Sequence, residues 1–111
     1  MPRKFGEIQI RAPRRYGKGE IIQIKARIIH PMETGFRKDK TTQQVIPAHY
    51  INEVKVFYGD ELLTAFDWTY AVSRDPLLTF YLRADRTAPL KIVWRDNKGK
   101  GGEKIIPIAP Q

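Results

Sequence analysis

The chain contains two histidines, His30 and His49, which are its first candidates for metal binding or acid–base chemistry. They stand at the ends of two predicted strands and flank a long connection, so the fold could bring them together. Met32 or Glu33 would then add a ligand, because histidine and methionine suit copper and histidine with carboxylate suits zinc. This ligand set is thin, and a histidine beside a proline at a strand end more often caps or packs. We therefore predict no metal ion and no cofactor.

Other residue types offer no catalytic arrangement. The one serine, Ser73, lacks the G-x-S-x-G turn that exposes a nucleophile. The pair Asp60-Glu61 is typical of a solvated turn, and the glycines of NKGKGG predict a hairpin turn more than an anion cradle. The absence of cysteine removes thiol nucleophiles, disulfides and thiolate metal centres. We predict that the chain has no catalytic residues and is not an enzyme.

Length and hydropathy favour one globular domain spanning residues 1–111. No apolar run approaches the roughly 20 residues that span a bilayer. The first residues, MPRKFGEIQI, carry positive charge but no apolar stretch of a secretory signal. Taken alone, this start predicts a cytoplasmic protein, although a chain can also be exported while bound to a partner that carries the signal.

Positive charge is concentrated in the first part of the sequence. Residues 1–40 contain eleven lysines and arginines against four acidic residues, whereas the remaining residues contain nine against eight. A cationic surface favours an acidic partner, an anionic small molecule or nucleic acid, or is simply solvated. For nucleic acid, Phe5, Tyr16 and Phe36 lie among the basic residues and could stack on bases. Phe5 fits the edge of a core better, however, and Tyr16 fits the cover of a turn.

Alternating hydrophobicity dominates the elements that must position these residues. Ile22, Ile24, Ala26 and Ile28, for example, fall on one side of a strand. Turn signals separate seven predicted strands, near residues 5–11, 20–30, 49–58, 61–67, 77–84, 90–96 and 103–109. This pattern predicts an all-β fold, an antiparallel β-sandwich of immunoglobulin-like kind. The 18-residue connection 31–48 is long for a compact domain, and such loops are often functional.

Two stretches of the sequence carry a specific resemblance. The connection begins HPMETGFRKDK after the strand EIIQIKARIIH, and a later segment reads AVSRDPLLTFYLRA. Together with Arg11-Ala12-Pro13, Lys18-Gly19-Glu20 and Val93-Trp94, these stretches resemble the sulfur-oxidation protein SoxZ over nearly the whole chain.

The resemblance implies a non-catalytic subunit that pairs with a SoxY-like chain in a SoxYZ carrier complex. That complex carries thiosulfate-derived sulfur on a cysteine of SoxY, and a chain without cysteine cannot hold the adduct itself. The resemblance also implies docking of other sulfur-oxidation enzymes. It further implies a periplasmic location, reached by export with the signal-bearing partner.

On this interpretation the connection 31–48 is an interaction surface. Arg37, Lys38 and Lys40 would hold acidic groups of a partner or attract anionic sulfur adducts. Met32 and Phe36 would supply an apolar anchor inside that polar rim. The alternative is that Met32 fills the end of the core and the charged residues are only solvated.

Overall fold

The computed structural model describes residues 4–111, so residues 1–3 of the segment MPRKFGEIQI lie outside it. Seven strands are present: β1 (Ile8–Arg11), β2 (Glu20–Ile28), β3 (Ile51–Tyr58), β4 (Glu61–Asp67), β5 (Leu77–Ala84), β6 (Ala88–Asp96) and β7 (Gly101–Ile108). Their ends lie within three residues of the predicted ones. The largest difference is at β1, because a turn in which Glu7 N–H bonds to the Lys4 carbonyl occupies the residues before it. Gly6 has a φ of +81° in this turn, which an extended strand cannot include.

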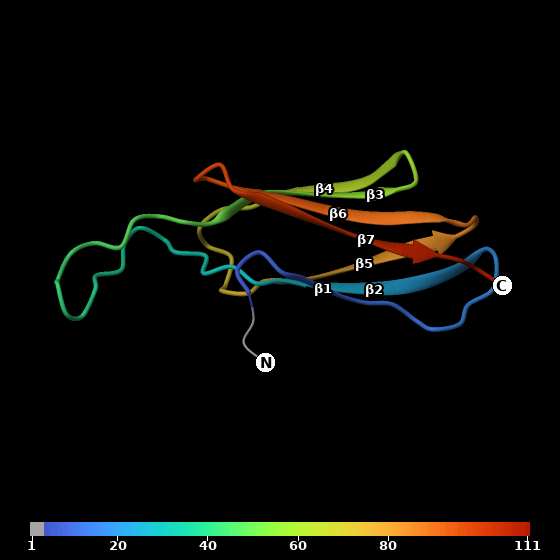
Figure 1. Cartoon of the computed structure of the whole chain (residues 1–111), viewed down its shortest axis with the longest axis horizontal. Coiled ribbons are helices and arrows are strands. Elements are labelled where there is room, and N and C mark those ends of the chain that lie inside the picture. Colours follow the sequence, from blue (N-terminus) through green and yellow to red (C-terminus); the bar gives the residue numbers. More distant parts are fainter. Residues whose placement is uncertain (1–3) are drawn as a thin grey trace.

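The strands form two antiparallel sheets that face each other. One sheet has the order β1-β2-β5 and the other the order β4-β3-β6-β7. Figure 1 shows them as two layers, with the three-stranded sheet below the four-stranded sheet. The predicted all-β, immunoglobulin-like sandwich is therefore confirmed. The described residues contain no helix long and apolar enough to cross a membrane.

The core lies between the sheets and follows the alternation in the sequence. In the three-stranded sheet, register pairs such as Ile22 with Leu82 and Ile24 with Phe80 point inward and are buried. In the four-stranded sheet, Val54 pairs with Trp94 in the same way. One cluster of buried residues joins both sheets. The sandwich is thus a rigid platform for the loops at its ends.

The connection 31–48, which we call the arm, projects from one end of the sandwich. Figure 1 shows it extending to the left, away from both sheets, and the molecule measures 56 × 28 × 18 Å along its principal axes. The two halves of the arm run antiparallel, with isolated bridges between Glu33 and His49 and between Lys38 and Val45. At its tip, the Asp39 carboxylate accepts hydrogen bonds from the backbone N–H groups of Thr41 and Thr42. The long loop is therefore an extended hairpin.

Candidate functional site

The two ends of the arm meet at a buried carboxylate. His30 Nε2 lies 3.0 Å and His49 Nε2 lies 2.7 Å from Asp96 Oδ2, at the end of β6. The other oxygen, Oδ1, accepts hydrogen bonds from the backbone N–H groups of Lys98 and Lys100. Asp96 and His30 are almost completely buried. We call His30, His49 and Asp96 the arm root, because they join both ends of the arm to the four-stranded sheet.

The hydrogen bonds of His30 determine where its proton lies. The backbone N–H of Met32 donates to His30 Nδ1 at 3.1 Å, so Nδ1 has no proton. The proton is then on Nε2 and is donated to Asp96. Burial lowers the pKa of His30 and outweighs the opposing effect of the Asp96 hydrogen bond. His30 is therefore a neutral donor.

The carboxylate in the centre of the arm root is ionised. Burial raises the pKa of Asp96, but hydrogen bonds from His30, Lys100, His49 and Lys98 outweigh burial and bring this pKa below its ordinary value. The four donors occupy the acceptor positions of a carboxylate. Asp96 therefore stays charged in the core with all of its hydrogen bonds satisfied.

These residues also form the one candidate metal cluster in the described part of the chain, with ligand atoms within 4.8 Å of one another. The proton arrangement does not fit a metal, because the Nε2 of His30 is a donor. The further ligands considered from sequence are also engaged, since the Met32 sulfur accepts from Ile51 N–H and Glu33 binds Arg37. The donor set fits a hydrogen-bonded anchor. Sequence reasoning brought the two histidines together but missed Asp96, whose only signal was its place before the NKGKGG turn.

Met32 lies in the core, as in the alternative interpretation that it fills the end of the sandwich, and its contact with a partner stays a prediction. Its side chain is 5% exposed and belongs to the main hydrophobic cluster. Its backbone has a φ of +51°, a conformation rare for residues other than glycine. The tight turn after His30 directs the Met32 side chain into the sandwich, and only a small part of the residue is exposed, where it borders a groove beside the arm.

The remaining predicted contact residues lie on the surface of the arm. Phe36 is 75% exposed and its ring lies edge-on to Tyr70, with centroids 5.4 Å apart. Arg37 donates to both carboxylate oxygens of Glu33, at 2.5 and 3.2 Å, and this pairing lowers the pKa of Glu33. Lys38 and Lys40 are exposed and form no ion pair with any described residue. Their contact with a partner stays a prediction.

A groove separates the arm from the connection between β4 and β5. It has a volume of about 610 Å³ and is lined by Pro31, Met32, Glu33, Thr34, Arg37, Tyr70, Ala71, Val72, Ser73 and Arg74. The two stretches HPMETGFRKDK and AVSRDP therefore face each other across one groove, which sequence reasoning did not predict. Ser73 lines the groove, but no histidine does. The groove is thus suited to binding and lacks a nucleophile–base pair.

Gly35 allows the two halves of the arm to approach closely beside this groove. It has a φ of +89°, and a Cβ atom added there would lie 3.1 Å from the Cβ of Ala48. A larger residue would strain the backbone and push the halves of the arm apart. The glycine of HPMETG therefore allows the close approach of the two halves of the arm at Ala48.

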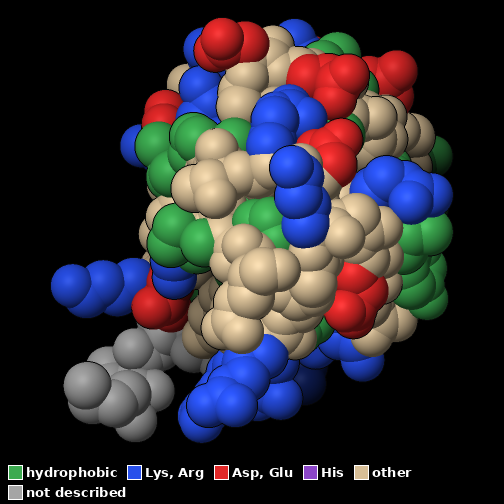
Figure 2. All heavy atoms as spheres, turned by 90° about the vertical axis from the view of Figure 1, so that its right-hand side faces the viewer, with side chains coloured by type: hydrophobic (Ala, Val, Ile, Leu, Met, Phe, Trp, Pro, Cys, Tyr) green, Lys and Arg blue, Asp and Glu red, His purple; other side chains and the backbone are tan. Residues whose placement is uncertain are grey.

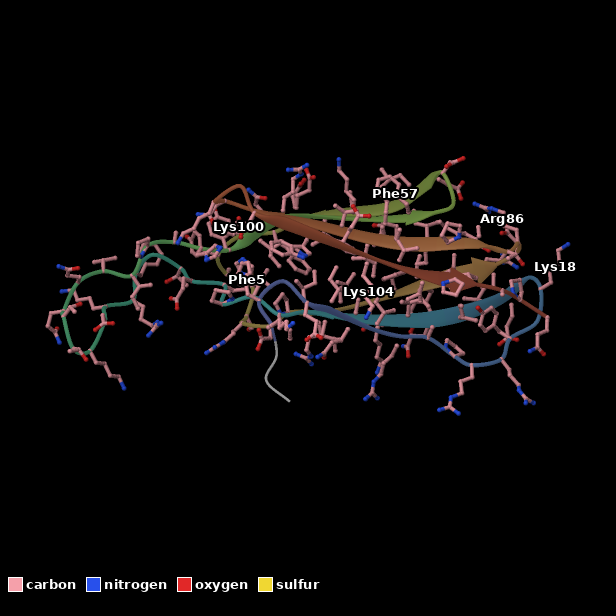
Figure 3. The ribbon with its side chains drawn as sticks, viewed as in Figure 1. Phe5, Lys18, Phe57, Arg86, Lys100 and Lys104 are labelled. Atoms are coloured by element: carbon pink, nitrogen blue, oxygen red, sulfur yellow. The ribbon has the colours of Figure 1, made fainter. Side chains whose placement is uncertain are left out.

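The three aromatic residues considered for base stacking do not share a surface. Phe5 packs on the arm root, with ring centroids 5.1 Å from His30 and 5.4 Å from His49. Tyr16 bonds to the backbone of Ala109 and Gln111, near the C-terminus. Figure 3 shows Phe5 at the end of the sandwich from which the arm leaves, and Figure 1 places the C-terminus at the opposite end. This separation does not favour a nucleic-acid groove.

Comparison with known proteins identifies a family and a fold. The family model described as sulphur oxidation protein SoxZ matches residues 10–106. Among solved structures, a variant of the superoxide reductase (neelaredoxin) from Ignicoccus hospitalis has a TM-score of 0.73 at 16% identity, covering 96% of this chain and 82% of that one. The sulfur carrier protein SoxY from Chlorobium limicola f thiosulfatophilum has a TM-score of 0.64 at 18% identity, covering 94% and 78%.

A third similar structure is the superoxide reductase (neelaredoxin) from Archaeoglobus fulgidus in the reduced form. It has a TM-score of 0.65 at 14% identity and covers 96% of this chain and 91% of that one. At these identities the three structures share the fold with this chain. No protein with curated function matches the sequence significantly.

Proposed function

Because this chain belongs to the SoxZ family of sulphur oxidation proteins, we propose that it is the non-catalytic subunit of a SoxYZ-type carrier complex. In this role it forms a heterodimer with a SoxY-like chain and acts as its scaffold. The sulfur derived from thiosulfate is held on a cysteine of that partner, since this chain has none. The complex reaches the periplasm through the signal of the partner.

One observation carries the proposal beyond family membership. The two stretches that resemble the family, HPMETGFRKDK and AVSRDP, line opposite sides of one groove. Both are held in place from the core: Asp96 joins the two ends of the arm, and Asp75 Oδ1 accepts a hydrogen bond from the backbone N–H of His30. A groove built in this way presents a preformed surface, which reduces the entropy lost on binding.

The exposed residues of the arm suit this role. Phe36 and Tyr70 place aromatic surface beside the groove, and aromatic side chains are enriched at protein interfaces. Arg37 lines the groove, and Lys38 and Lys40 are exposed farther along the same arm and add positive charge there. That charge attracts acidic groups of SoxY and the anionic adducts that the partner carries.

The test begins with co-expression of this chain and a SoxY-like chain, followed by size-exclusion chromatography. We expect one heterodimer peak at micromolar concentration, and separate elution would refute the proposal. The double reversal Arg37→Glu with Lys38→Glu should weaken the heterodimer or lower the rate of thiosulfate oxidation that the carrier complex supports. The effect should shrink at high salt. The matched control variant is Lys18→Glu with Lys104→Glu, which changes the net charge equally at exposed positions away from the arm.

A further inference from the structure

The outer face of the three-stranded sheet carries an unbalanced positive charge. Its outward-facing positions include four cations, Arg11 on β1, Lys25 and Arg27 on β2, and Arg83 on β5, and they include no acidic residue. We call this surface the cationic face. At the end of the sandwich opposite the arm, Figure 2 shows a group of Lys and Arg side chains along the lower edge, whereas Lys and Arg side chains higher in the view lie among acidic ones.

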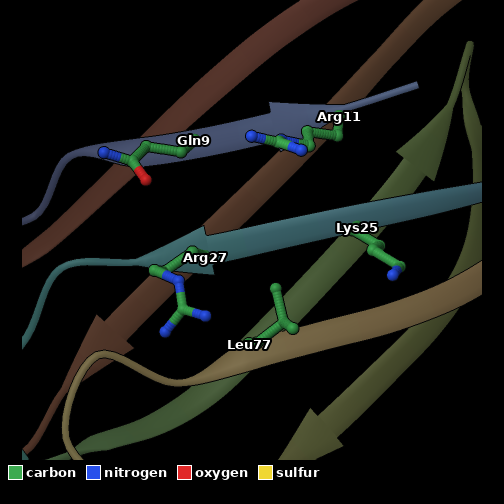
Figure 4. Close-up of a pocket in the computed structure, with 5 residues that line it drawn as sticks. All are labelled: Gln9, Arg11, Lys25, Arg27 and Leu77. Atoms are coloured by element: carbon green, nitrogen blue, oxygen red, sulfur yellow. The ribbon is translucent and has the colours of Figure 1, made fainter. Parts of the chain in front are cut away.

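Strand pairing places two of these cations directly opposite each other. Arg11 on β1 is the register partner of Lys25 on β2, and Arg27 is the partner of Gln9. Like charges directly opposite each other in a sheet are destabilising. A groove of about 290 Å³ lies among Gln9, Arg11, Lys25, Arg27 and Leu77, whose side chains Figure 4 shows on neighbouring strands.

No acidic side chain within the described residues forms an ion pair with these four cations. Arg27 donates to the backbone carbonyl of Asp75 at 2.7 Å, and Arg83 donates to that of Gly19 at 3.0 Å. Glu7 is the acidic residue that directly precedes β1. Its carboxylate accepts a hydrogen bond from the Gln9 side-chain amide at 3.5 Å. Two of the four cations, Arg27 and Arg83, are therefore held in place by backbone carbonyl groups, which do not neutralise their charge.

The outer face of the four-stranded sheet provides an internal comparison. It carries three cations and three acidic residues, Lys55, Lys91, Arg95, Glu53, Asp67 and Glu103. Glu53 is the register partner of Arg95, and it lies 3.6 Å from the ammonium of Lys55. Charge on that face is balanced across strands, so solubility alone does not require the imbalance on the other face.

Apolar side chains lie among the cations. Ile21, Leu77 and Tyr81 are 58%, 50% and 66% exposed and point outward on β2 and β5. Leu77 is the register partner of Arg27, and Ile21 is the partner of Arg83. Protein interfaces combine apolar contacts with charged rims. The phosphate backbone of a nucleic acid offers no apolar surface on which aliphatic side chains could pack. A small oxyanion would find no free backbone N–H on a sheet face.

We propose that the cationic face docks the acidic surface of a second protein, at a site separate from the arm groove. The identity of that protein rests on the proposed function: it is an enzyme that visits the sulfur-carrier complex. Complementary charge speeds such encounters and is screened by salt. The unpaired cations reduce the stability of the free chain and are neutralised when the visitor binds.

The test compares two variants in the complex with a SoxY-like chain. Arg11→Glu with Lys25→Glu alters the cationic face, and Lys18→Glu with Lys104→Glu is the control of equal charge. The rate of thiosulfate oxidation is measured in the reconstituted system with limiting carrier. We expect the first variant to lower the rate about tenfold at low salt, with most of the loss removed at high salt. The control should stay within about twofold of the parent chain.

Other outcomes overturn the proposal in distinguishable ways. An unchanged rate at low salt, with the heterodimer intact, removes the cationic face as a docking site. Loss of the heterodimer in the Arg11/Lys25 variant alone assigns this face to SoxY. Salt-sensitive binding of a short duplex DNA, or saturable binding of thiosulfate, that disappears in the same variant assigns the face to those ligands. Failure of the unmodified chain to pair with SoxY refutes the proposed function itself.

Discussion

His30 is the residue whose protonation most directly affects the arm root. It is buried as a neutral donor to Asp96, with a pKa below the ordinary value of 6.5. The unfolded chain therefore binds more protons than the folded chain between that lowered pKa and 6.5. The free energy of unfolding therefore rises with pH through this window. The contribution of His30 to stability is lost as the pH falls through the same window. The lowered pKa of Asp96 acts in the same direction below 3.8.

We expect His30→Gln to flatten this pH dependence. The glutamine amide can still donate to Asp96 but does not titrate, while His49 is the same in both proteins. The free energy of unfolding, measured by urea denaturation from about pH 7.5 to about pH 5, should fall less in the variant than in the parent chain. Equal slopes for the two proteins would contradict the assignment of a neutral His30.

Met32 distinguishes a core role from an interface role. Met32→Ala should reduce the free energy of unfolding by about 2–5 kcal/mol, because it removes a buried side chain from the main cluster. Phe36→Ala, at an exposed position four residues later, should change it by no more than about 0.5 kcal/mol but weaken the heterodimer. Urea denaturation and titration with the SoxY-like chain measure the two effects. A stable Met32→Ala with reduced affinity would show the opposite arrangement.

At the scale of elements, the pairing of β1 with β2 places two cations, Arg11 and Lys25, directly opposite each other on neighbouring strands. Lys25→Gln removes the repulsion with Arg11 and should raise the free energy of unfolding by about 0.2–1 kcal/mol at low salt. The gain should shrink as salt screens the pair. A double-mutant cycle with Arg11→Gln isolates the coupling, and Lys104→Gln, whose register partner is Ile92, serves as control. Additive effects of the two changes would show that the pair does not interact.

At the scale of the whole molecule, a packed sandwich carries a thin arm. Each sheet is joined by strand ladders of several register pairs and shares a common core with the other sheet, whereas two isolated bridges join the halves of the arm. Regions with few buried contacts open at low free-energy cost. We expect amides near the arm tip to exchange hydrogen much faster than those of β2 and β3, and to slow when the SoxY-like chain is bound. Exchange followed by mass spectrometry measures both states, and an arm as protected as the core would contradict this description.

Several features follow from the sequence by itself. The two-residue alternation of apolar side chains, as at Ile22 and Ile24, predicts both the strands and the side of each strand that is buried, because successive side chains in a strand point to opposite faces. Turn residues mark the ends of the strands to within a few positions. The absence of cysteine excludes thiol chemistry. The stretch HPMETGFRKDK predicts the family that the matching family model identifies.

Only the tertiary structure determines which residues that are distant in sequence become neighbours. Asp96 is 66 residues from His30 in sequence, and no local pattern connects them; pairing of β3 with β6 carries Asp96 to the root of the arm. Met32 is buried because the turn after His30 directs it inward. Arg11 and Lys25 become neighbours only through the register of β1 and β2. Local periodicity determines which way a side chain points, whereas long-range strand pairing determines its neighbours, and both the arm groove and the cationic face are built from such neighbours.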